Sequence, residues 1–173
     1  MIARRRLAAL VAGLSLVLAG CGWTPIYADP QTDVVDAELR TIRVYPILDR
    51  AGQRLETELR RALNPENLPS EKRYLLRVSM QTIRQNLGVQ SQGLGTRGEV
   101  QNIANMTLVD VKTGANLVSA TIHVNDSFDI QANGYSTEVA VDDAKVRTIA
   151  ELRDEIITRL TLFLQRRRAE AKT

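Results

Sequence analysis

The only cysteine of the 173-residue chain, Cys21, follows an N-terminal segment with three distinct zones. Arginines occupy positions 4–6, an apolar run extends from Leu7 to Leu18, and two small residues precede the cysteine. This order is typical of a secretory signal, and about a dozen apolar residues are fewer than the roughly 20 that a membrane-spanning helix needs. We therefore expect residues 1–20 to be cleaved. The chain that folds then has no second thiol for a disulfide, so packing alone must stabilise it.

The residues around the predicted cleavage point also indicate a lipid anchor. Leu18-Ala19-Gly20-Cys21 resembles the lipobox of bacterial lipoproteins, in which the signal is cut between Gly20 and Cys21. The thiol of Cys21 then receives S-diacylglycerol and the new amine receives an N-acyl chain such as palmitate. Several acyl chains on one residue give a stable membrane anchor. Because Gly22 stands where an Asp would resemble a retention signal for the inner membrane, we expect delivery to the outer membrane. No other cofactor is expected.

The charge of the mature chain gives no reason to expect a nucleic-acid partner. Three of the 23 basic residues lie in the signal, which leaves 20 basic residues against 20 acidic ones. A neutral chain that is exported lacks the basic excess that binding to nucleic-acid phosphates requires.

The spacing of apolar residues predicts the order strand, helix, three strands, helix. Apolar and polar residues alternate from Tyr74 to Met80, which is the period of a half-buried strand. Lys112–Ala115 is a turn sequence between two such runs and predicts a hairpin. The expected elements are strands at 39–45, from 74 onward, at 100–111 and at 117–128, a helix at 49–63 capped by Asp49 and ended by Asn64-Pro65, and a helix from about 137–142 to 168.

One sheet with both helices on its apolar face satisfies this order, so we expect an α+β fold. It should be a two-layer sandwich with a mixed sheet of about four strands, because a helix between the first two strands favours a parallel crossover and short turns favour antiparallel neighbours. The other sheet face is then free to meet solvent or a partner. A lipidated tether should occupy 21–37, a single domain 38–168, and a short tail 169–173.

The chain shows no residue pattern typical of an enzyme or a metal site. His123 lies on the polar phase of a predicted strand, where a surface position is the simplest interpretation. Asn125, Asp126 and Asp129 lack the spacing and glycine of a calcium loop and suit a turn. Gly93–Gly98 matches the dinucleotide-binding pattern but follows a polar segment and precedes a strand, where that site needs a strand before it and a helix after it. We therefore expect no catalytic residue and no metal ligand.

Several motifs of the mature chain resemble LPS-assembly lipoproteins of the LptE family. Cys21–Tyr27 is similar to the family's CGF-x-PLYG start, and differs from that family at Trp23, Ile26 and Ala28, where the family usually has Phe, Leu and Gly. The other similar segments, which together span nearly all of the mature chain, are Arg50–Gln53, Tyr74–Val78, Leu108–Asp110, Thr113-Gly114 and the last helix with Ile149, Leu152 and Leu160.

The resemblance implies a protein that stands as a plug in the lumen of LptD, the outer-membrane barrel of the LPS translocon. Such a protein assists barrel assembly and the passage of lipopolysaccharide to the cell surface. It would be anchored in the outer membrane by its lipid, facing the periplasm or lying within the barrel lumen. One alternative is a lipoprotein adaptor of another envelope machine, for barrel insertion or export. Another is a ligand-binding lipoprotein unrelated to lipopolysaccharide.

Contact with lipopolysaccharide would require basic side chains, because its phosphates accept charge-assisted hydrogen bonds. The candidates are Arg84, Arg97 and Lys112, which lie near predicted strand ends where loops can converge. Acidic residues are sparse in the sequence around the first two. Arg166–Arg168 suit the negative end of the last helix, so a solvated helix end is the simplest interpretation and a phosphate- or lipid-binding patch is the alternative.

Overall fold

The computed structural model describes residues 30–87 and 97–171, and Asp33 to Thr173 belong to one compact unit. The predicted signal, the lipidation site Cys21 and the glycine-rich stretch up to Thr96 lie outside the described residues. Among the described helices, none combines the length and apolar character that crossing a membrane requires.

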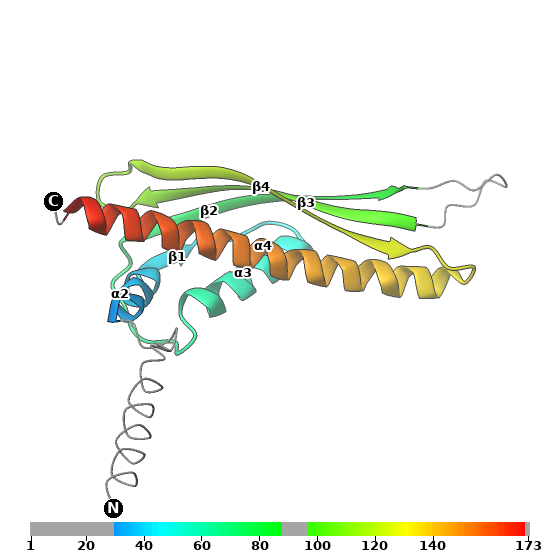
Figure 1. The fold of residues 1–173 in the computed structure, drawn as a ribbon, viewed down its shortest axis with the longest axis horizontal. Coiled ribbons are helices and arrows are strands. Elements are labelled where there is room, and N and C mark those ends of the chain that lie inside the picture. The colour runs from blue at the N-terminus through cyan, green and yellow to red at the C-terminus, as the bar shows by residue number, and fades with distance from the viewer. Residues whose placement is uncertain (1–29, 88–96, 172–173) are drawn as a thin grey trace, which may run out of the picture. The chain divides into compact units, whose positions relative to one another are not determined.

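The sheet contains four strands in the order β1-β2-β3-β4 (Figure 1). Their bounds are Ile42–Val44 for β1, Tyr74–Asn86 for β2, Arg97–Asp110 for β3 and Asn116–Asp129 for β4. The strand β1 runs parallel to β2, whereas β2 with β3 and β3 with β4 are antiparallel. The mixed sheet and the β3–β4 hairpin are therefore confirmed, and β1 is shorter than the predicted strand at 39–45.

Three helices lie on one side of the sheet (Figure 1): α2 at Pro30–Leu39, α3 at Arg50–Leu63 and α4 at Gly134–Ala171. The α3 helix begins and ends as predicted, because Asp49 accepts a hydrogen bond from the Gly52 amide at 2.7 Å and Asn64 is its C-cap. The α4 helix runs along the sheet and continues past the predicted end at Arg168 to Ala171. Together these elements confirm the α+β fold with helices packed on one sheet face.

The helix α2 was not predicted. The sequence indicated a tether at 21–37 and a strand beginning at Leu39; the described part of that tether, from Pro30, is helical instead, and Leu39 ends the helix rather than beginning a strand. Val35 and Leu39, one turn apart, are only 4% and 6% exposed and belong to the main core. Burial of these two side chains against the rest of the domain stabilises a short helix that would be marginal alone.

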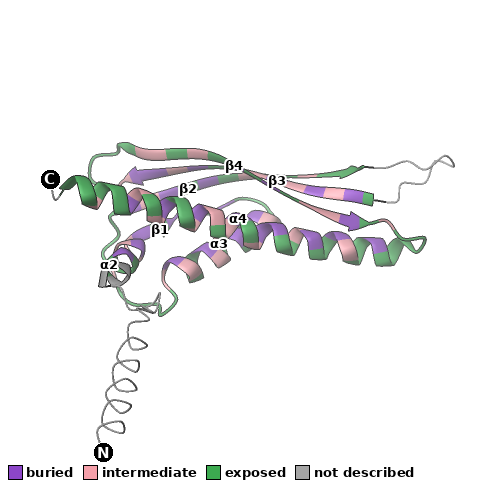
Figure 2. Cartoon of the chain, in the orientation of Figure 1, coloured by how far each residue is buried: buried purple, intermediate pink, exposed green. Residues whose placement is uncertain are grey.

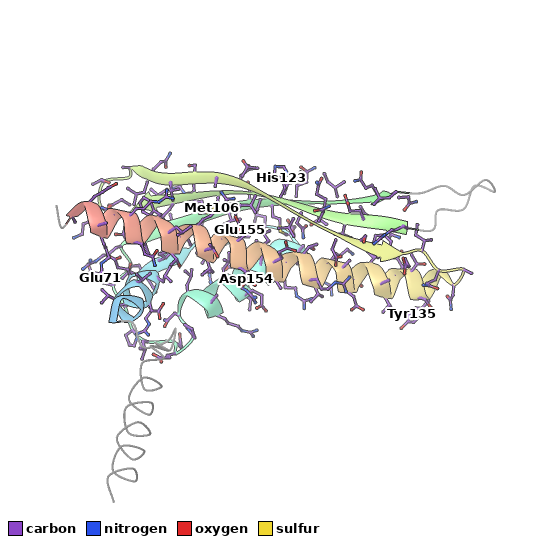
Figure 3. The ribbon with its side chains drawn as sticks, in the orientation of Figure 1. Glu71, Met106, His123, Tyr135, Asp154 and Glu155 are labelled. Atoms are coloured by element: carbon purple, nitrogen blue, oxygen red, sulfur yellow. The ribbon has the colours of Figure 1, made fainter. Side chains whose placement is uncertain are left out.

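The core is divided into two apolar clusters, and Figure 2 shows their buried residues along the strands and the inner sides of the helices. The main core fills the space between the sheet, α3 and the second half of α4; its fully buried members include Leu55, Leu59, Leu76, Met106, Leu108, Leu152, Ile156 and Leu160. The smaller cluster lies near the start of β3 and of α4 and contains Val100, Phe128, Val141 and Ala144. Figure 3 shows Met106 on the helix side of the sheet.

A buried polar bridge lies between the two clusters. Asn102 on β3 and Thr148 on α4 are both 0% exposed. The Asn102 side-chain amide donates to the Thr148 hydroxyl at 2.9 Å and its oxygen accepts from the Thr82 hydroxyl at 2.6 Å. The Thr148 hydroxyl in turn donates to the Ala144 carbonyl at 2.9 Å. The bridge therefore satisfies the buried polar atoms and fixes α4 against the sheet at this level.

Candidate functional site

The sheet face that points away from the helices is largely polar, and we call it the outer face. The residues of β2, β3 and β4 that alternate with the core residues form it, and among the described residues no helix covers them (Figure 1). Its polar members include Ser79, Gln81, Gln101, Asn105, Thr107, Ser119, Thr121, His123 and Asn125.

Neighbouring strands share hydrogen bonds between side chains across the outer face. The Thr121 hydroxyl donates to the Asn105 side-chain oxygen at 2.7 Å, and the Thr107 and Ser119 hydroxyls lie 3.2 Å apart. Glu99 accepts from Gln85 and from Asn125, each at 3.0 Å. These groups can exchange such bonds for bonds to a partner, so the outer face can meet a polar surface without leaving buried groups unpaired.

The candidates for catalysis or metal binding do not gather into a site. His123 is exposed on the outer face, which confirms the predicted surface position (Figure 3). Asp126 lies on the helix side and forms an ion pair with Arg147 at 2.6 Å. Within the described part of the chain, no three His, Cys, Asp or Glu side chains are placed to hold a metal ion.

Arg84, the first of the candidates for contact with lipopolysaccharide, is engaged with α4 and β4. Its guanidinium forms an ion pair with Glu138 at 2.8 Å and lies 5.3 Å from the centroid of the Phe128 ring. Acidic residues are sparse around Arg84 in the sequence, but the fold brings Glu138 from the first turns of α4 against it. Arg84 therefore ties the start of α4 to the sheet, and its charge is compensated.

Arg97 opens β3 and lies on the outer face at the same end of the sheet. Its guanidinium donates to the Ser127 hydroxyl on β4 at 2.7 Å. Among the described residues it has no ion-pair partner, although Asp129 is its register neighbour. The close packing of Phe128 over the next residue, Gly98, holds this corner, because a Cβ on Gly98 would collide with the Phe128 ring. Gly98 thus belongs to β3, which begins three residues before the strand predicted at 100–111.

Lys112 lies in the β3–β4 turn, at the opposite end of the sheet from Arg97. Since β3 has 14 residues and a strand rises about 3.3 Å per residue, roughly 40 Å separate the two ends. Arg84 and Arg97, although at one end, lie on opposite faces of the sheet. The structure therefore does not bring the three candidates together, and one bound molecule of ordinary size could contact only one or two of them.

The end of the sheet near Lys112 contains a contact that the sequence did not suggest. Arg167 donates to the Tyr74 hydroxyl at 3.2 Å, and its guanidinium lies 5.7 Å from the centroid of the Tyr74 ring. In the adjacent turn, Asp110 accepts from the amides of Lys112 and Thr113. The Thr113 amide is the main reason why the pKa of Asp110 lies below its ordinary value, and the charge of Arg167 also contributes. One arginine of the predicted solvated triplet thus packs onto the sheet.

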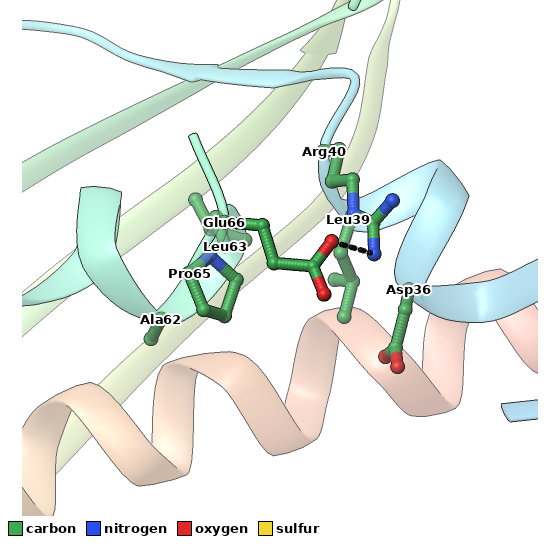
Figure 4. Close-up of a pocket in the computed structure, with 7 residues that line it drawn as sticks. All are labelled: Asp36, Leu39, Arg40, Ala62, Leu63, Pro65 and Glu66. Carbon is green, nitrogen blue, oxygen red and sulfur yellow. Dashed lines mark ion pairs between the residues drawn. The ribbon is translucent and has the colours of Figure 1, made fainter. Parts of the chain in front are cut away.

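A small cleft of about 180 Å³ lies where α2 approaches the end of α3 (Figure 4). Arg40 and Glu66 form an ion pair across it at 3.3 Å. Leu39 and Pro65 supply part of its wall. Asp36 is a second acid in the lining, so after the Arg40–Glu66 pair the cleft keeps one negative charge and offers no site for an anion.

Comparison with known proteins places the fold among bacterial lipoproteins. No protein-family model matches the sequence, and no curated protein matches it. A candidate lipoprotein from Caulobacter crescentus has a similar structure with 26% identity and a TM-score of 0.64, covering 77% of this chain and 97% of that one.

Two further solved structures share the fold at lower identity. A minor lipoprotein from Acinetobacter baumannii has 17% identity and a TM-score of 0.58, over 71% of this chain and 92% of its own. The rare lipoprotein B from Shewanella oneidensis has 12% identity and a TM-score of 0.54, over 76% of this chain and 98% of its own. Nearly the whole of each solved chain is matched, so the likeness extends over the entire fold of these chains.

Proposed function

We propose that this protein is an outer-membrane lipoprotein that plugs the barrel of the LPS translocon, helps that barrel to assemble and assists delivery of lipopolysaccharide to the cell surface. The observation that carries the proposal is the uncovered polar outer face. The interior of a large outer-membrane barrel is polar. A domain that presents hydroxyl and amide side chains from three strands can therefore lie against the barrel wall with its hydrogen bonds satisfied.

The membrane anchor of the proposal rests on Cys21 and on the fold. The lipobox sequence supplies the acylated residue, and the similar solved structures are lipoproteins. The resemblance of Cys21–Tyr27 to the LptE family supports LptD as the barrel. A permanent tether would keep the domain at the membrane where the barrel folds, which raises its effective concentration there.

Contact with lipopolysaccharide is assigned in this proposal to the end of the sheet near Arg97. Arg97 is exposed and lacks an ion-pair partner in the described part of the chain, whereas the charge of Arg84 is compensated by Glu138. Lys112 is roughly 40 Å away at the other end of β3. Arg97 is therefore the strongest of the three candidates for binding a phosphate of the ligand.

The test is copurification of the lipidated protein with its partner in mild detergent. We expect a large outer-membrane barrel at equal stoichiometry from the unchanged protein. Thr121→Arg, which places a charge halfway along the edge strand β4 on the outer face, should reduce the amount of barrel recovered. The matched control is Thr57→Arg, at an exposed position on α3.

Two results would contradict the proposal. Equal barrel recovery by Thr121→Arg and Thr57→Arg proteins of equal stability would exclude the outer face as the interface. Unchanged barrel abundance and unchanged surface lipopolysaccharide after depletion of the protein would remove the translocon role. A different partner in the pull-down would then favour an adaptor of another envelope machine, and an enriched small ligand would favour a ligand-binding lipoprotein.

A further inference from the structure

An open cleft of about 480 Å³ lies on the helix side of the sheet, between the start of α3 and the first half of α4. We call it the α3–α4 cleft. Thr82 of β2 and Asp142 of α4 are among the residues that line it. Its other lining residues are Arg50, Ala51, Arg54, Lys145, Val146 and Ile149. The cleft is thus on the opposite side of the sheet from the outer face and from Arg97.

The charges of the α3–α4 cleft are not balanced. Three basic side chains line it, from Arg50, Arg54 and Lys145, against the single acid Asp142. Lys145 and Asp142 form an ion pair at 2.9 Å. The pKa of Asp142 lies below its ordinary value, mainly because Lys145 donates a hydrogen bond to it and also because of the charges of Lys145 and Arg50. The guanidinium groups of Arg50 and Arg54 have no hydrogen bond or ion pair among the described residues, and Asp142 is the single acid of the lining, so the cleft keeps an excess of two positive charges.

The position of these arginines on α3 makes the imbalance more significant. Arg50 is the first residue of α3, and no acidic residue lies in the first turn of that helix. A helix N-terminus carries a partial positive charge that acts over about the first turn, so the charge of Arg50 is unfavourable there unless an anion compensates it. Asp49 supplies part of this compensation as the N-cap. A further anion in the cleft would bind both arginines and the helix end together.

The cleft also has an apolar floor. Val146 and Ile149, three residues apart on α4, both line the cleft; Val146 is 36% exposed and supplies apolar surface, whereas Ile149 is 3% exposed and belongs to the core beneath it. Ala51 of α3 is half-buried beside them. A small hydrophilic anion would leave this apolar surface in water, while a molecule with an apolar body would cover it.

We propose that the α3–α4 cleft binds a phosphorylated amphiphile. Its phosphate lies between Arg50, Arg54 and Lys145, and its apolar body packs on Ala51 and Val146. For the biological source of the amphiphile this inference rests on the proposed lipid-delivery function. The binding chemistry itself depends only on the cleft, and it adds a contact separate from the one assigned to Arg97.

The test measures binding of defined probes to the lipidated protein in a nonionic detergent by titration calorimetry. The probes are dihexanoyl phosphatidic acid, dihexanoyl phosphatidylcholine and inorganic phosphate. We expect phosphatidic acid to bind at least about tenfold more tightly than either other probe, since only it combines an unshielded phosphate with acyl chains. Arg50→Gln and Arg54→Gln should each weaken its binding about tenfold.

The matched control is Arg61→Gln, which removes the same charge from the same helix outside the cleft, where the Arg61 side chain is 74% exposed and pairs with Glu58. Equal affinity of the Arg54→Gln and Arg61→Gln proteins would overturn the proposal. So would equal binding of phosphatidic acid and phosphatidylcholine, and equally tight binding of inorganic phosphate would reduce the cleft to a site for free anions.

The two proposals can fail separately. Loss of barrel copurification with retained binding of phosphatidic acid would remove the translocon role and leave the cleft assignment intact. Normal barrel recovery with no phosphatidic acid binding would remove only the cleft assignment.

Discussion

The buried bridge between Asn102 and Thr148 allows a quantitative test of how α4 is held on the sheet. Thr148→Val keeps the shape of the side chain but removes the hydroxyl that accepts from Asn102 at 2.9 Å. Because Asn102 is 0% exposed, its amide hydrogen would have no water to replace the lost acceptor. Leaving such a group unpaired costs about 1–3 kcal/mol. We expect the free energy of unfolding to fall by that amount.

The assay is urea unfolding of the mature Cys21→Ala protein, followed by circular dichroism. With a denaturant dependence of about 2 kcal/mol per molar urea, the midpoint should fall by roughly 0.5–1.5 M. The matched control is Thr158→Val, since Thr158 is exposed on the same helix. It should change the midpoint little, because the β-branched side chain and its helix propensity are retained.

A double variant separates the hydrogen bond from simple loss of packing. Asn102→Leu combined with Thr148→Val replaces both partners by apolar groups, which is far less costly than leaving one unpaired. The sum of the losses in unfolding free energy of the two single variants should therefore exceed the loss in the double variant by about 1 kcal/mol or more. Strict additivity, or a Thr148→Val midpoint equal to that of Thr158→Val, would refute the role of the bridge.

Three further predictions concern single positions. Arg97→Ala should weaken binding of purified lipopolysaccharide and reduce the salt dependence of that binding, whereas Lys112→Ala should bind as tightly as the unchanged protein does. Equal affinities of the two variants would contradict the assignment of this contact to the Arg97 end of the sheet. Cys21→Ala, exported by a cleavable signal, should give a folded protein in the soluble fraction, and membrane attachment at the normal level would contradict the lipid anchor. Because the pKa of Asp110 is lowered in the folded protein, its charged form stabilises the turn above the ordinary carboxyl pKa, and this contribution is lost as the pH falls. The difference in unfolding free energy between the unchanged protein and Asp110→Asn, measured by urea unfolding, should therefore shrink below about pH 4.

Features set by neighbouring residues were predictable from the sequence. The alternation of Tyr74, Leu76 and Val78 places all three on the buried face of β2, as the structure confirms. The cap at Asp49 and the turn after Asp110 follow from side-chain hydrogen bonds to amides two or three residues away. In each case the atoms that stabilise the feature are close in sequence, so the pattern alone specifies it.

Features that depend on distant residues were not predictable. The ion pair between Arg84 and Glu138 joins residues far apart in the chain, and α2 is stabilised by burial of Val35 and Leu39 in a core formed by other elements. One signal was available in the sequence: Asn102 lies in phase with the apolar positions of its strand, so it could have been identified as a buried polar residue in need of a partner.

The placement of Arg97 and Lys112 could also have been deduced from the predicted elements. Two long strands joined by a turn bring the turn to one end of the sheet and the start of the first strand to the other. With about 3.3 Å per residue, the strand length alone excludes a shared site. The expectation that loops at sheet ends converge holds only for loops at the same end, and this distinction decides which basic residues can act on one ligand.

The two proposed contacts use opposite sides of the sheet, and this has a consequence for how they combine. If the outer face lies against a barrel wall, the α3–α4 cleft faces away from that part of the wall, so binding there need not compete with docking. Thr121→Arg should then reduce barrel recovery without changing the affinity for phosphatidic acid, and Arg54→Gln should have the reverse effect. The Asn102–Thr148 bridge lies between the two surfaces and positions α4, which carries Lys145. If the Thr148→Val protein stays folded, its affinity for phosphatidic acid should therefore fall before its barrel recovery does. The reason is that α4 contributes half of the residues that line the cleft and none of those on the outer face.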